Sequence, residues 1–188
     1  SGGNITNVTT GVFVNNYDGY NSDAGDGGHA TLSGVTISNV TTGIRVLDNV
    51  LSTHANVQLS IGSGVSVSNA TTGLSVENAS SSVLALSDLT FTGVSGKYID
   101  LVNNAGNLDA TAVTFGGVTG ATATLAQNFG IEDKINHKVD NSALGFVSVK
   151  ANNDFVTLNS YVSPNTTPSI QRGIDAASNN YTVNVQAG

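Results

Sequence analysis

Residues 37–46 read ISNVTTGIRV, and this stretch decides the fold because it recurs. Residues 5–14 read ITNVTTGVFV and residues 67–76 read VSNATTGLSV. Two degenerate copies follow from Phe91 (FTGVSGKYIDL) and Phe115 (FGGVTGATATL), so successive copies start 32, 30, 24 and 24 residues apart. A repeat of this period that contains no helix indicates a solenoid or array. Each copy alternates apolar and polar residues around Asn, Thr and Gly, so we predict an all-β parallel β-solenoid of about five rungs.

The repeat also predicts which side chains face the core. Equivalent residues of stacked rungs should lie about 4.8 Å apart and form continuous apolar rows. The predicted inward rows are Val35, Val65, Leu89 and Val113; Ile5, Ile37, Val67, Phe91 and Phe115; Val12, Ile44 and Leu74; and Val14, Val46, Val76, Leu101 and Leu125.

One polar position recurs at the bend of the repeat. Asn7, Asn39 and Asn69 are equivalent residues of the first three copies. We predict a structural ladder in which their amides form hydrogen bonds along the stack. Each of them also lies in an Asn-x-Thr glycosylation motif, so glycosylation is the alternative reading.

The pattern changes after about residue 129. The most charged stretch, IEDKINHKVD over residues 131–140, is predicted to be a short helix or a capping loop. We therefore divide the chain into coils (1–130), capping or linking strands around an Asn-Asn-Asp turn (131–163), and an appendage (164–188). The appendage contains a predicted amphipathic helix over 169–177 and a strand over 181–185.

The appendage carries a family resemblance. SIQRGIDAASNNYTVNVQAG over residues 169–188 resembles the capping helix and first strand of right-handed parallel β-helix proteins of the pectate-lyase-like superfamily. The repeats resemble the coils of that family, and residues 130–150 are similar to boundaries between tandem β-helix modules of large bacterial surface proteins and adhesins. The resemblance implies a right-handed parallel β-helix. It also implies that Ile170, Ile174, Val183 and Val185 cap this module, a neighbouring molecule or the next module.

Composition excludes several functions. The 188 residues include 6 Lys and Arg against 13 Asp and Glu, for a formal net charge of −7. Nucleic acids and anionic membranes are bound through basic patches, so we expect neither as a partner. No apolar run is long enough for membrane insertion. Only 10% of the residues are charged, and there is no Cys, which is typical of an exported repeat protein, extracellular or on the cell surface.

The loop after the first repeat contains the candidate binding residues. Asp18, Asp23 and Asp26 could supply the oxygen ligands of calcium, although an ordinary acidic loop is the alternative. Tyr17 and Tyr20 could stack on a sugar or cover the core. No cofactor is otherwise expected, with calcium the one candidate.

Catalysis and ice binding have weaker signals. No outward row places two acids on neighbouring rungs, and the nearest to a catalytic pair is Asp48 with Glu77. We therefore predict no catalytic residue and no enzyme. Thr36, Ser38, Ser66, Ser68, Thr90, Thr92 and Thr114 form outward hydroxyl rows of the kind that could bind ice.

These observations predict a structural or adhesive module, a stalk or fibre segment that contacts itself or adjacent modules end to end. The alternative is a carbohydrate-binding or carbohydrate-processing module with glycans as partners. An ice-binding Thr/Ser face is the third candidate.

Overall fold

A computed structural model describes residues 2–16, 28–48, 57–79, 83–103, 105–161 and 169–187. These residues are mostly β-strand, and most of the strand pairs are parallel. The strands are β1 (Gly3–Thr6), β2 (Thr10–Asn15), β3 (His29–Leu32), β4 (Val35–Leu47), β5 (Gln58–Ile61), β6 (Ser66–Glu77), β7 (Val83–Leu86), β8 (Thr90–Thr92), β9 (Lys97–Val102), β10 (Leu108–Asp109), β11 (Thr114–Phe115), β12 (Val118–Thr119), β13 (Ile135–Asn136), β14 (Val147–Ser148), β15 (Asn153–Val156) and β16 (Thr182–Val185). The helices are α1 (Leu125–Glu132) and α2 (Ile170–Ala176).

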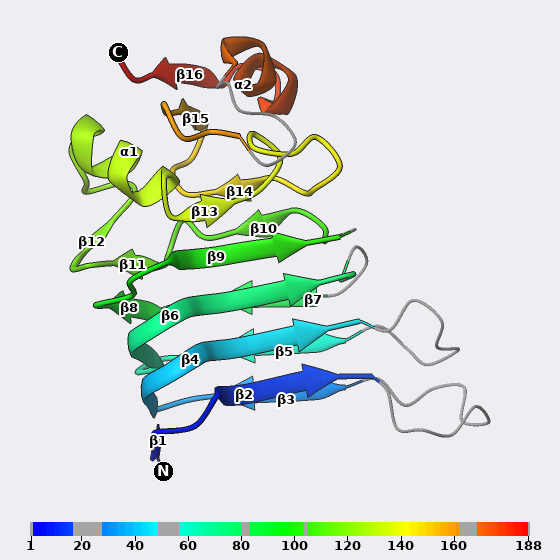
Figure 1. Cartoon of the computed structure of the whole chain (residues 1–188), viewed down its shortest axis with the longest axis vertical. Helices are drawn as coiled ribbons and strands as arrows, with labels where there is room; N and C mark the ends of the chain where they lie inside the picture. Colours follow the sequence, from blue (N-terminus) through cyan, green and yellow to red (C-terminus); the bar gives the residue numbers. More distant parts are fainter. Residues whose placement is uncertain are drawn as a thin grey trace.

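The repeats stack in register. Strands β4 and β6 each contain a whole decapeptide, and they pair in parallel with Ile37 opposite Val67 and Val46 opposite Val76. Strands β1 and β2 continue this pairing on one side, and β8 and β9 continue it on the other. In Figure 1, β2, β4, β6 and β9 lie one above another, with β3, β5 and β7 behind them. The predicted row from Ile5 to Phe115 is confirmed as a series of register partners.

The core lies between these strand layers. The second layer consists of β3, β5 and β7, which pair in parallel, and of the parallel pair β10 and β14. Alternate side chains of both layers point inward, which is the period-2 pattern of a strand with one buried face. Ile37, Ile44, Val67, Leu74 and Phe91 are each 0% exposed.

The glycine of the decapeptide packs against the next repeat. A Cβ atom on Gly43 would lie 2.4 Å from Val67 Cγ1 and 2.6 Å from the Gly73 carbonyl oxygen. Gly11 and Gly73 have the same close contacts, with Ile37 and Phe91 respectively. Glycine is therefore required here so that the inward side chain of the neighbouring strand fits beneath the backbone.

Replacing Gly43 with Ala is expected to destabilise the fold by about 1–3 kcal/mol, because the added methyl group overpacks the core and meets a backbone oxygen that cannot move aside. Gly130→Ala is the matched control, since a Cβ atom there would have nothing within 4 Å. Gly130 lies inside α1, so its replacement should stabilise by roughly 0.5–1 kcal/mol. Urea unfolding of both variants measures the difference, and equal effects of the two would contradict the close packing.

The fifth copy departs from the predicted stack. Phe115 pairs with Phe91 as expected, but β11 then turns back and pairs antiparallel with β12, which makes the main sheet mixed. Helix α1 follows. Thr124 and Gln127 form a reciprocal capping box at its start, and this Thr-x-x-Gln signal is visible in the sequence. The predicted inward position of Leu125 is therefore wrong, because Leu125 begins the helix and is 54% exposed.

Strand β13, rather than the fifth copy, continues the stack above β9, with Ile135 opposite Ile99. Residues 131–140, for which a short helix or a capping loop was predicted, do not form a helix of their own. They contain the end of α1, a turn, β13 and a second turn. Strand β14 precedes the Asn-Asn-Asp stretch and β15 begins within it at Asn153, and the two strands pair with β10 and β16 rather than with each other.

The predicted elements of the appendage are confirmed as α2 and β16. Strand β16 pairs in parallel with β15, with Val183 opposite Asp154 and Val185 opposite Val156. Figure 1 shows both elements at the end of the stack that is remote from the N-terminus. The appendage therefore packs on this molecule's own last strands.

Candidate functional sites

The two carboxylates nearest to a catalytic pair are both engaged in contacts between strands. Asn16 Nδ2 donates to Asp48 Oδ1 at 2.6 Å, and Asp48 is buried. Glu77 Oε2 accepts from Arg45 Nη2 at 3.1 Å, and Glu77 Oε1 accepts from Asn103 Nδ2 at 3.0 Å. These contacts tie neighbouring strands together.

The three ladder asparagines occupy a left-handed bend. The φ angles of Asn7, Asn39 and Asn69 are 58°, 55° and 50°. Asn69 Nδ2 donates to Asn39 Oδ1 at 3.3 Å, and both side chains are exposed. The equivalent residues of the last two copies are Gly93 and Gly117, with φ of 63° and 96°. Asn and Gly are the residues that tolerate this conformation best, so the positive φ angle explains why every copy has one or the other at this position.

The outward hydroxyl rows are also in register. Thr36, Ser66, Thr90 and Thr114 are successive partners, and Ser38, Ser68 and Thr92 form the neighbouring row. Both rows mix Thr and Ser, so the methyl groups that would give a regular lattice are unevenly spaced.

The residues predicted for calcium and for sugar stacking, Asp18, Asp23, Asp26, Tyr17 and Tyr20, lie outside the described residues. Within the described ranges, no group of three or more His, Asp or Glu side chains is arranged to hold a metal ion. Neither described helix is long and apolar enough to cross a membrane.

The appendage presents an apolar end surface. Ile170 and Ile174 are 55% and 53% exposed, because α2 packs through Gly173 and Ala176 instead. The expectation that the two isoleucines cover this stack is therefore wrong. Of the predicted cap residues, Val183 packs against a buried cluster that includes Val156, whereas Val185 is 43% exposed.

A buried polar cluster lies beneath α2, and sequence reasoning missed it. The cluster consists of four side chains that are each at most 4% exposed. Three of them, Glu132, His137 and Asp140, belong to the charged stretch over residues 131–140, and Asp154 belongs to β15. His137 is one residue beyond the pair Asn136–Asp100, so it takes the core position above Leu101. The helix rests on this cluster, because a Cβ atom on Gly173 would lie 3.4 Å from Asp154 Oδ2.

The cluster is held by short hydrogen bonds. His137 Nε2 and Glu132 Oε1 are 2.6 Å apart, and the Val147 amide donates to His137 Nδ1 at 3.0 Å. The ring therefore carries its proton on Nε2 and donates it to Glu132. Asp140 Oδ2 accepts from the His137 amide, and Arg172 of α2 donates to the Asp140 carbonyl oxygen.

Burial sets the charge of the cluster. Desolvation lowers the pKa of His137, but the charge and hydrogen bond of Glu132 outweigh it, so the pKa is raised above its ordinary value. Desolvation raises the pKa of Asp140 to about 6. Asp154 is affected most, because burial and the Glu132 carboxylate raise its pKa to about 7 and its Oδ2 atom has no hydrogen-bond partner. Burial therefore favours the protonated forms of Asp140 and Asp154.

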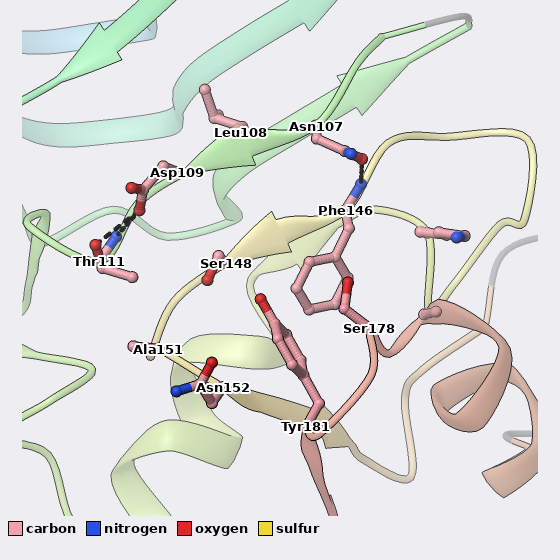
Figure 2. Close-up of a pocket in the computed structure, with 12 residues that line it drawn as sticks. Asn107, Leu108, Asp109, Thr111, Phe146, Ser148, Ala151, Asn152, Ser178 and Tyr181 are labelled. Carbon is pink, nitrogen blue, oxygen red and sulfur yellow. Dashed lines mark hydrogen bonds between the residues drawn. The ribbon is translucent and has the colours of Figure 1, made fainter.

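A cavity of about 560 Å³ lies beside the appendage. It opens between the strands β10 and β14 and the segment that runs from Ser178 to Tyr181, as Figure 2 shows. Tyr181, Phe146, Asp109 and Asn107 contribute to its walls.

Comparison of the chain with protein-family models, curated proteins and solved structures finds no match.

Proposed function

We propose that this chain is a non-enzymatic structural or adhesive module, a segment of a right-handed parallel β-helix on the cell surface or outside the cell that associates end to end. The observation that carries the proposal is the surface at the appendage end. There β16 and β15 form a separate two-stranded parallel sheet, and β15 is the one strand partner of β16 among the described residues. An unpaired strand edge is a ready template for another strand.

The side chains around this edge favour protein contact over solvent. Leu158, Ile170, Ile174 and Val185 are each between 43% and 55% exposed. A hollow of about 190 Å³ lies among Leu158, Ile170 and Val185. Apolar side chains clustered in this way mark an interaction surface more often than scattered ones do.

The opposite end also has a strand with one pairing partner. Strand β2 pairs with β4 alone among the described residues, and Val8, which lies between β1 and β2, is 44% exposed. A contact between the two unlike ends is heterologous, so it does not close on itself and builds a linear fibre. The occupant of the appendage end is therefore a second β-helix segment, from another copy or an adjacent module.

Association should be visible as a mass that rises with protein concentration in sedimentation velocity, with elongated particles in electron micrographs. The double variant Ile170→Lys with Val185→Lys should remain monomeric, because two charges would be buried unpaired in the contact. Leu125→Lys is the matched control, since Leu125 is equally exposed but lies on α1. A monomer at every concentration, or association that the double variant leaves unchanged, would overturn the proposal.

A further inference from the structure

The appendage is joined to the stack by a contact of its own. Strand β16 pairs with β15 in a two-stranded sheet that is separate from the main sheet. The apolar side chains beneath α2 form a small cluster of Val139, Val156 and Ala176, joined by Phe146 and Val183, and none of the five belongs to the large core of the coils. A unit that is held by few buried apolar contacts opens at a lower free energy than the rest of a fold. The docking of α2 and β16 can therefore change while the coils stay folded.

The polar part of this contact lacks hydrogen-bond donors. Asp154 is 1% exposed, and its Oδ1 atom accepts from the Phe155 amide at 2.8 Å. Its Oδ2 atom has no partner among the described residues and faces Gly173 of α2, where a Cβ atom would lie 3.4 Å away. His137 has no donor left for this oxygen, because Nε2 contacts Glu132 and Nδ1 accepts from a backbone amide. The docked helix thus closes over a carboxyl oxygen that neither water nor a donor solvates.

Two cations lie near the cluster, and they donate to backbone oxygens of its surroundings. Lys97 Nζ of β9 donates to the carbonyl oxygens of Asp133 and Ile135. Arg172 Nη1 of α2 donates to the carbonyl oxygen of Asp140 at 2.7 Å. The last of these contacts ties α2 directly to the chain segment that carries a buried acid.

The cluster contains three buried acids and one histidine. Glu132, Asp140 and Asp154 would carry three negative charges if all were ionised, and His137 could offset one of them. Burial favours the neutral form of a carboxyl group, and each ionised neighbour adds repulsion. Burial and the Glu132 charge raise the pKa of Asp154 to about 7, and burial raises the pKa of Asp140 to about 6 although His137 and Lys97 lower it. Because both values lie above the ordinary 3.8, docking is favoured at low pH and weakens as the pH rises.

We infer that α2 and β16 form a conformational switch, which docks on β15 while Asp140 and Asp154 are protonated and is released when they ionise. Release gives both carboxylates access to water, which removes the cost of burying their charge. It also takes β16 away from the edge of β15 and uncovers Val139 and Val156, while the coils remain stacked. The switch is an event within one molecule, so it goes beyond the proposed fibre and can fail independently of it.

Thiol labelling measures the docking cleanly, because the chain contains no cysteine. Ala176→Cys places a thiol in the buried contact of α2, and Ala70→Cys places one in the core of the coils, where the register partner Val40 shows that a larger side chain fits. Dividing each labelling rate by that of an unstructured cysteine peptide at the same pH removes the ionisation of the thiol itself.

Protection at position 176 should fall at least tenfold from pH 5 to pH 8. The reason is that docking weakens by up to tenfold per pH unit between the pKa values of the exposed and the docked acid. At pH 8, position 70 should remain at least tenfold better protected than position 176, because the coils stay folded. Equal protection of the two positions at every pH would mean that the appendage opens only with the whole fold, and it would overturn the inference.

Asp154→Asn identifies the group that controls the switch. In the Ala176→Cys protein it should shrink the loss of protection between pH 5 and pH 8 at least fivefold, because the amide cannot ionise. Asp175→Asn, in an exposed position of α2, is the matched control and should keep the full loss. A loss that Asp154→Asn leaves unchanged would contradict the role of the buried acids.

Hydrogen exchange of the unsubstituted chain gives a second readout that no variant can disturb. The amides of Thr182 and Gln186 donate to the carbonyl oxygens of Asn152 and Val156, so they report the pairing of β16 with β15. From pH 5 to pH 8 their protection factors should fall at least tenfold and drop below those of the coil strands β4 and β6. Protection factors that stay constant over this range would overturn the inference.

Discussion

Replacing Val67 with Asp is expected to abolish folding or to lower the melting temperature sharply. Val67 is 0% exposed and lies in register between Ile37 and Phe91 in the middle of the stack. Its Cγ1 atom would be 2.4 Å from a Cβ atom on Gly43, so no space exists for water around a new carboxylate. An unpaired charge in such a position costs several kcal/mol, which is a large part of the stability of a domain.

Ser68→Asp is the matched control for this variant. Ser68 is the next residue on the same strand, but its side chain is on the outward face between Ser38 and Thr92. A new charge there stays hydrated, so the change in stability should be within about 0.5 kcal/mol. Circular dichroism melts of the two variants measure the contrast. A Val67→Asp protein that melts close to the wild type would show that the inward row is misassigned.

The second large effect concerns pH. Asp154 is buried with a pKa of about 7, against an ordinary value of 3.8 in the unfolded chain. The folded state therefore holds a proton that the unfolded state has released between these two values. The stabilisation that Asp154 contributes is complete below about pH 4 and is lost as the pH rises toward 7. Asp140, with a pKa of about 6, adds to the same trend.

Asp154→Asn should remove the larger share of this pH dependence, because the amide is neutral at every pH. Relative to wild type, the variant should gain stability on going from pH 4 to pH 8, by an amount on the order of a few kcal/mol. Urea unfolding at several pH values gives the slope, which is independent of any constant cost of the amide. Asp175→Asn, in an exposed position of α2, is the control and should keep the wild-type slope. An unchanged slope in Asp154→Asn would mean that Asp154 is ionised in the folded protein.

The cluster also contacts the helix that carries the proposed association surface. Asp154 lies against Gly173 of α2, and Arg172 of the same helix holds the Asp140 carbonyl. We therefore expect ionisation of the buried acids to weaken the packing of α2, the helix that carries Ile170 and Ile174. If the apolar end surface mediates fibre formation, association should weaken between about pH 6 and pH 8.

The stacking of the repeats could be predicted from the sequence because the signal is local and repeated. Alternation with period 2 indicates strands, and the equivalent positions of Ile37 and Val67 within their repeats indicate which residues pair. The bend asparagines were visible for the same reason, although the cause of their recurrence is the positive φ of Asn39 and Asn69, which a sequence does not display.

The end of the stack depended on contacts that no local pattern contains. The copy that starts at Phe115 reads like the others, yet the rings of Phe91, Tyr98 and Phe115 pack together there, and the chain turns into β12 and α1. The capping box at Thr124 was a readable sign of the helix, but the repeat pattern, which favoured an inward Leu125, was the stronger signal.

The buried polar cluster and the cavity beside the appendage also depend on contacts between residues that are distant in the sequence. By composition, the charged stretch from 131 to 140 reads as a solvated surface, because burying an isolated charge is costly. Only the tertiary structure brings Glu132, His137 and Asp154 together, where His137 forms a hydrogen bond with Glu132 and both residues affect the pKa of Asp154. Likewise, Phe146 and Tyr181 are separated by more than thirty residues, and they form one wall only because β16 returns to pair with β15. The sequence by itself determined the rows of the core, since alternation and repetition act between near neighbours. Tertiary packing decided the buried acids and the cavity beside the appendage, since it alone sets which distant side chains lie together.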